Sequence, residues 1–414
     1  MHHVIIGNGP AGVIAAETVR KAAPADQITL VGDEPEPPYS RMAIPYLLIG
    51  NIAEQGTYLR KGQRHFAEQR INLLCARAER IDTQLKTVVL SNHQMLPYDR
   101  LLIASGSTPI RPPIPGMDLP NIHPCWTMTD ARQIIAKAQP GSRVLQMGAG
   151  YIGCIIMEAL AARGVKLTIV EMGNRMVPRM MTEGAGGLIK VWCEQKGIRV
   201  FTNTKVDALE QRGSNLAARL SSGDVIEADL VISSTGVKPN ISFLAGSGIA
   251  CDQGILVDEK METSVPGIFA AGDVSQSLDF STGQKLVNAV QPVAVDEARI
   301  AALNMAGKKA STQGSLAMNV LDTLGLVASS FGQWWGAEGG DHAELNDAAN
   351  FKYLRLEFLG EHLIGATSLG LTEHVGAIRG LIQTRARLGE WKGRLMADPT
   401  RLMEAYLATA QAAE

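Results

Sequence analysis

The sequence predicts an α/β fold in which helices cover the faces of parallel sheets, and three observations predict it. An apolar run at 4–6 leads into the glycine-rich turn GNGPAG, and a second apolar run at 144–147 leads into GAGYIG. Each turn opens an alanine-rich helical pattern. Beyond the turns, apolar strand segments continue to alternate with helical segments, which is typical of parallel sheets with buried faces.

Both turns match the G-x-G-x-x-G fingerprint of dinucleotide-binding units. In this motif the first glycine permits a tight turn, the second lets the backbone approach a pyrophosphate, and the third lets helix and strand pack closely. The pyrophosphate then lies at the helix N-terminus, where unpaired N–H groups and the helix dipole favour its charge. Two such motifs predict two dinucleotide sites. The motif residues are Gly7, Gly9, Pro10, Ala11 and Gly12 in the first turn, and Gly148, Gly150, Tyr151, Ile152 and Gly153 in the second.

An acidic residue follows the next strand after each fingerprint. Glu171, at the end of KLTIVE, lies close to the spacing of about 20 residues expected for a carboxylate that binds the ribose hydroxyls. Such a carboxylate repels a 2′-phosphate, which favours NADH over NADPH, although Arg175 offers a guanidinium that could accommodate that phosphate. After the first fingerprint Asp33 and Glu34 both qualify, and we prefer Asp33 because it follows the strand end more closely.

Length, charge and cysteine content limit the function classes. The chain has 414 residues, enough for about two to four domains, and its formal charge of -2 implies no general attraction to nucleic acid or membranes. The first strand begins at residue 4, so we expect no signal peptide, and no apolar run reaches the roughly 20 residues of a membrane span. The cysteines lack metal-ligand spacing, and we expect reduced thiols in a cytoplasmic protein. They are Cys75, Cys125, Cys154, Cys193 and Cys251.

Changes in composition along the chain divide it into successive units. Residues 1–112 form a first unit that closes with the strand and turn DRLLIASGS, and the proline-rich segment at 108–116 is a semi-rigid crossing. A second unit, 113–240, carries the second fingerprint and ends with STGVKPN. We expect further strands in it near 198–202, 216–220 and 228–234.

The remainder predicts a third segment and a C-terminal domain. Residues 241–310 contain GIFAAGDV and a helix expected from Pro292 to Ala306, with Gly307 as its stop. A polar linker at 307–314 precedes an α+β domain at 315–414. That domain is predicted from strand-like runs at 318–331 and 353–370, followed by two helical stretches.

Five segments together resemble the FAD-dependent pyridine nucleotide oxidoreductase family. VIIGNGPAG, LLIASGS, GAGYIG, STGVKPN and GIFAAGDV occur in the family's order. The resemblance implies that 1–112 and 241–310 bind FAD and that the inserted unit 113–240 binds NAD(H). It also implies that 315–414 is an interface domain, a candidate surface for homo-oligomer formation.

The resemblance also implies roles for single residues. The carboxylate of Asp273 would accept a hydrogen bond from the ribityl chain of FAD. The helix that starts near Pro292 would point its N-terminus at the pyrimidine edge of the flavin, where its partial positive charge stabilises the anion formed on reduction. Arg41 matches an FAD-contacting arginine, the alternative being a solvated loop arginine. The implied FAD-contacting residues are Arg41, Ala104, Ser105, Gly106, Gly272, Asp273, Val290 and Gln291, and Gly236 belongs to the NAD(H) side.

The chain departs from this family at the redox centre. PYSRMAIPYLLIG at 38–50 lies where relatives carry one or two reactive cysteines, and Met42 occupies that place. A thioether forms neither a thiolate nor a disulfide, so dithiol and sulfenic-acid chemistry are excluded at this position. Pro10 stands where NADH peroxidases of the family have a histidine, so we do not expect peroxide reduction.

A lysine and a glutamate that pair beside flavin N5 in many relatives are both absent. Ile155 stands at the glutamate position and Tyr46 at the lysine position. Loss of one partner alone would leave an uncompensated buried charge, so their joint replacement is physically coherent. Hydride transfer needs only nicotinamide C4 held about 3 to 3.5 Å from flavin N5, so we expect no catalytic acid or base. For Tyr46 two interpretations remain open: it lies near the flavin, or it is an ordinary helix residue.

Without a cysteine relay, we expect reduced flavin to pass electrons directly to an iron–sulfur protein or subunit. One candidate docking surface is a basic cluster, whose alternative is a solvated helix face. Another is the pair Trp334 and Trp335, for which a core role is the alternative. The basic cluster comprises Arg379, Arg385, Arg387, Lys392, Arg394 and Arg401, against Glu390 and Asp398.

The loop YSRMAIPYLL is most similar to flavoproteins grouped with nitrite reductase and with ferredoxin and rubredoxin reductases. It also resembles the NAD-reducing subunits of phenylglyoxylate dehydrogenase-type complexes. We therefore expect an NAD(H)-dependent FAD oxidoreductase that exchanges electrons with an iron–sulfur partner. The alternatives are an NADH oxidase that reduces oxygen and a redox-sensing binding protein resembling apoptosis-inducing factor.

Overall fold

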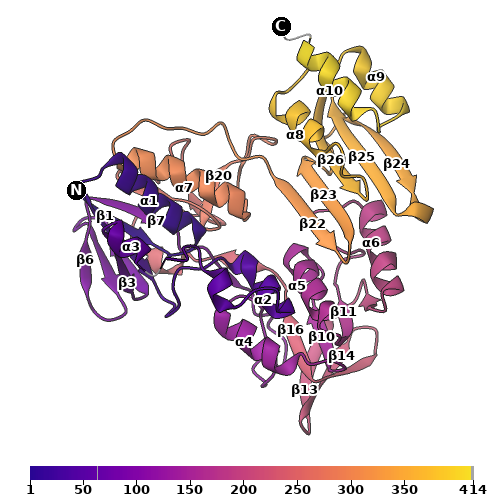
Figure 1. Ribbon diagram of the computed structural model, residues 1–414, viewed down its shortest axis with the longest axis horizontal. Coiled ribbons are helices and arrows are strands. Elements are labelled where there is room, and N and C mark those ends of the chain that lie inside the picture. Colours follow the sequence, from indigo (N-terminus) through magenta and orange to yellow (C-terminus); the bar gives the residue numbers. More distant parts are fainter. Residues whose placement is uncertain (63, 412–414) are drawn as a thin grey trace. The chain divides into compact units, whose positions relative to one another are not determined.

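The computed structural model describes residues 1–62 and 64–411, and the chain divides into two compact units. Unit 1 comprises Met1–Leu47, Ile52–Thr108 and Val237–Ser315. Unit 2 comprises Leu48–Asn51, Pro109–Gly236 and Leu316–Glu414. Each unit contains a parallel five-stranded sheet, which confirms the predicted α/β class with two dinucleotide-type domains (Figure 1). Residues 412–414 of the predicted C-terminal domain lie outside the described residues.

Unit 1 is built on a sheet in the order β19-β7-β1-β2-β3. Its strands are β1 (His2–Ile6), β2 (Gln27–Gly32), β3 (Ile71–Cys75), β7 (Arg100–Ile103) and β19 (Ile268–Ala270). In the pairing register, Ile6 of β1 lies opposite Val31 of β2 and Ile103 of β7. The carboxyl ends of these three strands therefore meet at one edge, and the first glycine-rich turn leaves from that edge.

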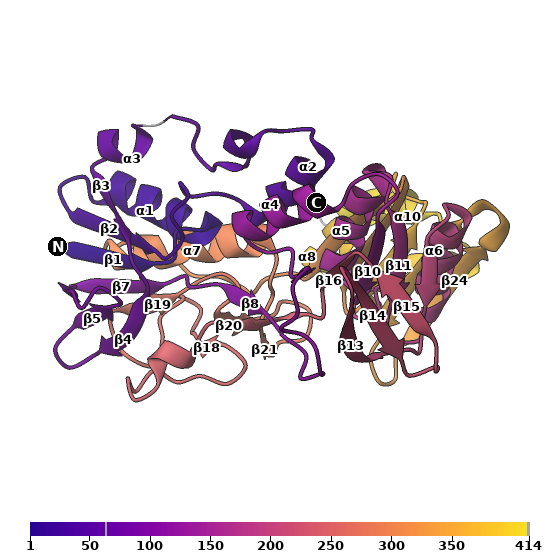
Figure 2. The ribbon, with the colours of Figure 1, turned by 90° about the horizontal axis from the view of Figure 1, so that it is seen from below.

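Helices α1 (Pro10–Ala22) and α7 (Gln291–Met305) pack against each other and lie side by side in both views (Figures 1 and 2). Pro10 suits the first helical turn because it has no N–H to leave unpaired, and Arg20 and Lys21 suit the last turn because of the helix dipole. Their apolar faces join the sheet in one core, which includes Val4, Ile5, Val13, Leu102, Ala298 and Ala302. The helix expected at 292–306 is thus found within one residue at each end.

Shorter elements complete unit 1. Two helices of one or two turns are α2 (Ile44–Ile49), which ends in a segment of unit 2, and α3 (His65–Glu68). One antiparallel sheet contains β4 (Ala78–Asp82), β5 (Thr87–Leu90) and β6 (Met95–Pro97), and another small sheet contains β18 (Ile255–Leu256), β20 (Ser275–Leu278) and β21 (Lys285–Leu286). The chain leaves unit 1 through β8 (Ser107–Pro109) and returns through its pairing strand β17 (Val237–Pro239).

Unit 2 repeats the same plan with the sheet order β12-β11-β10-β16-β9. Its strands are β9 (Ile122–His123), β10 (Arg143–Met147), β11 (Lys166–Val170), β12 (Arg199–Phe201) and β16 (Leu230–Ser233). Its helices are α4 (Met128–Lys137), α5 (Tyr151–Ala162) and α6 (Glu183–Gln195). An antiparallel sheet of β13 (Val206–Arg212), β14 (Asn215–Leu220) and β15 (Val225–Ala228) packs on it in a shared apolar core. The three strands expected near 198–202, 216–220 and 228–234 are β12, β14 and β16.

The C-terminal part of unit 2 is an antiparallel sheet in the order β22-β23-β26-β25-β24, covered by helices. The two strand-like runs are hairpins, β22 (Met318–Thr323) with β23 (Leu326–Gly332) and β25 (Lys352–Leu359) with β26 (His362–Leu369). The polar, largely exposed edge strand β24 (Asp341–Asp347) carries too weak an apolar alternation to be predicted.

The prediction of two terminal helical stretches is wrong, because there are three helices within the described residues: α8 (Val375–Gln383), α9 (Glu390–Ala397) and α10 (Leu402–Gln411). Pro399 disfavours helical backbone at Asp398, and the Asp398 carboxylate accepts hydrogen bonds from the N–H and hydroxyl of Thr400. The break thus separates α9 from α10. In the part of the chain that the structure describes, no helix is long and apolar enough to cross a membrane.

Candidate functional site

The first glycine of each fingerprint adopts a backbone conformation that requires glycine. Gly7 has a φ of 105° and Gly148 a φ of 95°. A Cβ built on Gly7 would lie 2.0 Å from the carbonyl oxygen of Ala104, and one on Gly148 would lie 2.4 Å from that of Ser234. Any side chain would therefore push the turn away from the neighbouring strand end, as expected for this motif.

The third glycine of each fingerprint is enclosed by the turn, whereas the second has open space beside it. A Cβ on Gly12 would lie 1.8 Å from the oxygen of Gly7, and one on Gly153 would lie 2.6 Å from that of Gly148, so each helix packs directly on its own turn. A Cβ on Gly9 or Gly150 would meet nothing within 4 Å. Both second glycines are helix N-caps with a φ of -72° and no side-chain cap. The N-terminus of each helix thus has no side-chain cap and has open space beside its second glycine, which fits a pyrophosphate.

Asp273 reaches the same edge of unit 1 from a distant part of the chain. The turn after β19 continues from the sheet, because Ala271 N–H donates to the oxygen of Ile103 at 3.1 Å. Asp273 Oδ2 accepts a hydrogen bond from Ser107 Oγ at 2.8 Å. Burial raises the pKa of the Asp273 carboxyl, while the bond from Ser107 and the positive charge of Arg41 act in the opposite direction. The structure thus brings Arg41 and Asp273 close enough to influence each other.

The Ala104–Ser105–Gly106 turn is held by a residue that the sequence analysis did not single out. Ala104 N–H donates to the oxygen of Ile6 at 2.7 Å, which places the turn beside the first fingerprint. Asn240 then accepts from Ser105 Oγ through its main-chain oxygen at 3.0 Å and donates through Nδ2 to Ser105 O at 2.9 Å. Asn240 closes the segment STGVKPN, so the signal for its role was its place in a family motif.

The two acidic candidates after β2 have different surroundings. Glu34 accepts from the hydroxyl of Tyr39 and from the guanidinium of Arg41, both at 2.6 Å, and Arg41 also donates to the Tyr39 hydroxyl at 2.7 Å. Asp33 pairs with Arg77 at 3.1 Å, and their side chains are 48% and 72% exposed. The closed ring of bonds fixes the Glu34 carboxylate, whereas Asp33 has a single exposed ion pair among the interactions described above. The preference for Asp33 as ribose ligand stays a prediction, with Glu34 as the alternative.

The loop that contains Arg41 is tied to the N-terminus of α7. Ser40 Oγ donates to Gln291 Oε1 at 2.9 Å, and Val290 is the N-cap of the helix. Met42 and Tyr46 follow with 44% and 57% of their surface exposed. Unit 1 therefore gathers the first fingerprint, the Arg41 loop, the 104–106 turn, Asp273 and the α7 N-terminus around one edge of its sheet.

Four of the five cysteines have a thiol whose pKa is raised by burial. Cys125, Cys154 and Cys193 are buried, and burial raises the pKa of all three, to about 12 for Cys125 and Cys193. Burial also raises the pKa of Cys251. Because the thiolate is the nucleophile, a raised pKa disfavours this reactive form in all four cysteines. The fifth, Cys75, is exposed at the end of β3.

In unit 2, Glu171 is buried against the second fingerprint. Its Oε2 accepts from the N–H of Ala149 and its Oε1 from the N–H of Gly173, both at 2.7 Å. The N–H of Val177 donates to the oxygen of Ala149 at 2.8 Å. The middle residue of the second turn thus has both main-chain groups bonded to the segment that starts at Glu171. Each carboxylate oxygen of Glu171 keeps a lone pair for a further donor.

Arg175 is used inside its own loop. Its guanidinium donates to the oxygen of Met181 at 2.8 Å, to that of Pro178 at 3.1 Å and to Asn174 Oδ1 at 2.8 Å. Its side chain is 20% exposed. These bonds occupy most of the donors that a 2′-phosphate would need. Gly236, the last predicted residue of this unit, has a φ of 105° and its oxygen accepts from Ile110 N–H at 2.8 Å, where the chain crosses between the units.

The two candidate docking surfaces, the basic cluster and the tryptophan pair, differ in ion pairing and exposure. Four of the six basic residues pair with carboxylates, namely Arg387 with Glu361, Lys392 with Asp341, Arg394 with Glu390 and Arg401 with Glu404. The local positive surplus is largely balanced, which favours the alternative of a solvated helix face. Trp334 and Trp335 form an edge-to-face pair with ring centroids 5.5 Å apart, and Trp335 is 55% exposed. Trp335 therefore lies on the surface and not in the core.

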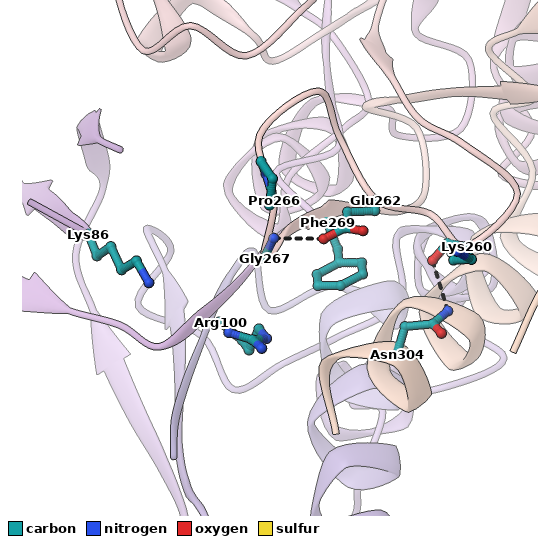
Figure 3. Close-up of a pocket in the computed structure, with 8 residues that line it drawn as sticks. All are labelled: Lys86, Arg100, Lys260, Glu262, Pro266, Gly267, Phe269 and Asn304. Atoms are coloured by element: carbon teal, nitrogen blue, oxygen red, sulfur yellow. Dashed lines mark hydrogen bonds between the residues drawn. The ribbon is translucent and has the colours of Figure 1, made fainter. Parts of the chain in front are cut away.

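A cavity of about 350 Å³ in unit 1 lies away from these residues (Figure 3). Arg100 begins β7 and Gly267 precedes β19, so the cavity is at the amino ends of the strands, opposite the fingerprint edge. Ligands of open parallel sheets bind beyond the carboxyl ends. Two polar lining groups are used to hold the local loop, since Glu262 accepts from Gly267 N–H at 2.7 Å and Asn304 donates to Lys260 O at 3.0 Å. We assign no cofactor to this cavity.

Comparison with known proteins agrees with this geometry. A family model described as pyridine nucleotide-disulphide oxidoreductase matches residues 1–298. The chain is 30% identical over 401 residues to the NADH-dependent phenylglyoxylate dehydrogenase subunit epsilon of Aromatoleum evansii, covering 96% of this chain and 95% of that protein. It is 32% identical over 273 residues to the ferredoxin–NAD(+) reductase component of the biphenyl dioxygenase system of Paraburkholderia xenovorans, covering 66% of each. Its fold matches that of a covalent putidaredoxin reductase–putidaredoxin complex with a TM-score of 0.90 at 24% identity, covering 99% of both chains.

Proposed function

The chain belongs to the pyridine nucleotide-disulphide oxidoreductase family and uses FAD and NAD(H), and we propose how its residues divide the two cofactors. FAD is held in unit 1 and NAD(H) in unit 2. The observation that carries this proposal is the matched geometry of the two glycine-rich turns, Gly7–Gly12 and Gly148–Gly153, which we call the first and second cradle. Each has open space beside its second glycine and lies at the carboxyl edge of its own parallel sheet. When bound, the two cofactors supply the hydride donor and acceptor, and the protein supplies binding and orientation.

In unit 1 the proposed FAD contacts come from four segments. The N–H groups at the start of α1 bind the pyrophosphate, and Asp273, fixed by Ser107, accepts from the ribityl hydroxyls. The guanidinium of Arg41 balances negative charge beside Asp273. The N-terminus of α7, capped by Val290 and joined by Gln291 to the Arg41 loop, directs its partial positive charge toward the flavin.

In unit 2 the proposed contacts explain a preference for NADH. Glu171 is oriented by Ala149 and Gly173 N–H groups, and its remaining lone pairs accept from the ribose hydroxyls. A 2′-phosphate would meet this buried carboxylate, and Arg175 is committed to Met181, Pro178 and Asn174. The buried carboxylate therefore disfavours NADPH by charge, and the guanidinium of Arg175 is already hydrogen-bonded within its loop.

The electrons leave the flavin without a thiol relay. Met42 cannot carry a thiolate, and the raised pKa of four cysteines disfavours their thiolate form. We propose an iron–sulfur protein or subunit as the partner, supported by relatives whose names include ferredoxin reductase and a dehydrogenase subunit. Trp335 is the proposed docking residue because it presents a large exposed apolar ring. A cytoplasmic location and homo-oligomer formation through the C-terminal domain belong to the same proposal.

Anaerobic rapid mixing tests this function. The FAD-loaded full chain is first reduced with NADH and then mixed either with a [2Fe–2S] ferredoxin or with oxygenated buffer. We expect flavin reduction by NADH and faster reoxidation by ferredoxin than by oxygen. Flavin that stays oxidised contradicts the function, turnover with oxygen as fast as with ferredoxin indicates the NADH oxidase, and a long-lived reduced complex with both acceptors indicates the redox-sensing binding protein.

A further inference from the structure

Glu297 is a buried carboxyl group that none of the roles above uses. It lies in α7 with only 5% of its surface exposed. Its Oε2 accepts from the N–H of Gly272 at 2.9 Å and from Ser275 Oγ at 2.7 Å, and its Oε1 accepts from Ser277 Oγ at 2.6 Å. All three donors belong to one short segment of the chain, residues 272–277. A buried carboxyl group is costly unless it is hydrogen-bonded, so this arrangement calls for a reason.

The segment that Glu297 holds is the one that presents Asp273. Bonds to Glu297 attach on both sides of Asp273, at Gly272 before it and at Ser275 and Ser277 after it. Asp273 itself makes no bond to Glu297 and uses Oδ2 to accept from Ser107. The carboxyl group of Glu297 therefore fixes the main chain of the turn and leaves the Asp273 side chain directed elsewhere.

The same turn also touches the first fingerprint. A Cβ built on Gly272 would lie 3.3 Å from the Cβ of Ala11 in α1 and 3.4 Å from that of Ala294 in α7. Gly272 is thus enclosed between the helix that follows the first fingerprint and the helix that carries Glu297. A displacement of the turn would change the distance between Asp273 and the N-terminus of α1.

We propose that Glu297 is a positioning residue for FAD: it fixes the Gly272–Asp273 turn between α1 and α7, so that Asp273 and the N-terminus of α1 engage one FAD molecule together. This inference rests on the proposed assignment of FAD to unit 1. It requires hydrogen-bond acceptance by Glu297 and not its negative charge. Glutamine preserves the shape, with an oxygen for Gly272 and Ser275 and an amide that donates to Ser277 Oγ.

The test measures FAD dissociation from the loaded full chain after dilution, followed by the rise of flavin fluorescence. We expect Glu297→Ala to speed dissociation by about tenfold or more, since one lost net hydrogen bond alone is worth up to about tenfold. Glu297→Gln is expected to stay within about threefold of the parent chain. The matched control is Glu357, a carboxylate that is 4% exposed in the C-terminal sheet, and Glu357→Gln should leave FAD dissociation unchanged.

A double-mutant cycle with Asp273→Asn separates a role through Asp273 from a general loss of packing. In the Glu297→Ala chain, Asp273→Asn should have a smaller effect on FAD dissociation than in the parent chain. Additive effects, or equal dissociation from the Glu297→Ala and parent chains, would overturn the inference, as would equal losses in Glu297→Gln and Glu297→Ala. If Glu297→Ala does not fold, the Ser277→Ala chain takes its place in the cycle. A parent chain that binds no FAD refutes the proposed function instead.

Discussion

The two glycine-rich turns share one backbone geometry, but different kinds of neighbours hold them in place. In unit 2 the support is local: Gln146 of β10 donates to the oxygens of Gly148 and Gly153 at 2.9 and 3.0 Å, and Glu171 bonds to Ala149 from the next strand. In unit 1 the residue at the place of Gln146 is the buried apolar Ile5. The two turns beside the first fingerprint are held by residues from other segments, since Asn240 accepts from Ser105 and Glu297 accepts from Gly272.

The two sites therefore differ in which parts of the chain must come together to form them. The second turn has its side-chain support between β10 and the loop after β11, and it also lies against Ser234 after β16, all within one continuous stretch of unit 2. The first cradle lies beside a turn of β7 and a turn after β19, which are joined only when the chain has returned from unit 2. We therefore expect binding at the first site to depend on residues far apart in sequence.

The largest effects are expected at the two open second glycines. Gly9→Val and Gly150→Val place a side chain where no atom lies within 4 Å, so both chains should fold. The branched side chain then fills the space intended for a pyrophosphate. We expect Gly9→Val to lose at least about 100-fold in FAD affinity, corresponding to about 2.7 kcal/mol. Gly150→Val should retain FAD and lose NADH reduction instead. Flavin absorbance per protein and the rate of anaerobic reduction measure the two outcomes, and equal loss of FAD in both variants would remove the distinction between the sites.

A smaller effect is expected at Glu171. Glu171→Ala removes the ribose acceptor and leaves the N–H groups of Ala149 and Gly173 without their carboxylate. We expect the NADH Michaelis constant to rise by about tenfold or more, because the lost charged hydrogen bonds are each worth about 1.5 to 3 kcal/mol. The relative preference for NADH over NADPH should also fall. FAD content serves as the internal control, since Glu171 lies in unit 2, and an unchanged Michaelis constant refutes the assignment.

The two acidic candidates in unit 1 provide a paired comparison. Glu34→Gln breaks the charged bond to Arg41 and changes the acceptor for Tyr39, whereas Asp33→Asn loses only an exposed pair with Arg77. Exposed ion pairs contribute about 0 to 1 kcal/mol, so the second change should be nearly silent unless Asp33 binds the ribose. We expect FAD to dissociate about tenfold faster from Glu34→Gln than from Asp33→Asn. Faster dissociation from Asp33→Asn than from Glu34→Gln in a flavin-release assay would favour Asp33 as the ribose ligand.

The smallest effect is expected at Gln146, the local support of the second turn. Its Oε1 is buried without a hydrogen-bond partner among the described residues, while its Nε2 holds Gly148 and Gly153. Gln146→Leu removes both the two bonds and the unpaired oxygen, so the free energy of unfolding should change by only about 1 kcal/mol. The NADH Michaelis constant should rise by a few-fold while FAD binding stays unchanged. Thermal unfolding together with steady-state kinetics checks this, and weakened FAD binding would contradict the separation of the two sites.

The sequence predicted what depends on local pattern. Both fingerprints, Glu171 and the helix that became α7 were found because glycine spacing and apolar periodicity determine them over short stretches. The bonds of Asn240 and Glu297 could not be predicted, because their partners lie 135 and 20 to 25 residues away in the sequence and no periodic signal links them. The bonds of Glu34 to Tyr39 and Arg41, which distinguish it from Asp33, could not be predicted from a spacing rule either. The third terminal helix was missed because a single Asp-Pro break was not recognised.

The central claim is that one flavin, with no redox cysteine, takes electrons from NADH and passes them on directly. Anaerobic titration of the FAD-loaded chain with NADH, before and after alkylation of its accessible thiols, tests this most directly. We predict that about one equivalent of NADH reduces each flavin fully, because hydride transfer carries two electrons, and that alkylation changes neither the endpoint nor the later reoxidation by a [2Fe–2S] ferredoxin. A requirement for a second equivalent of NADH, or loss of ferredoxin reduction after alkylation, would contradict the claim.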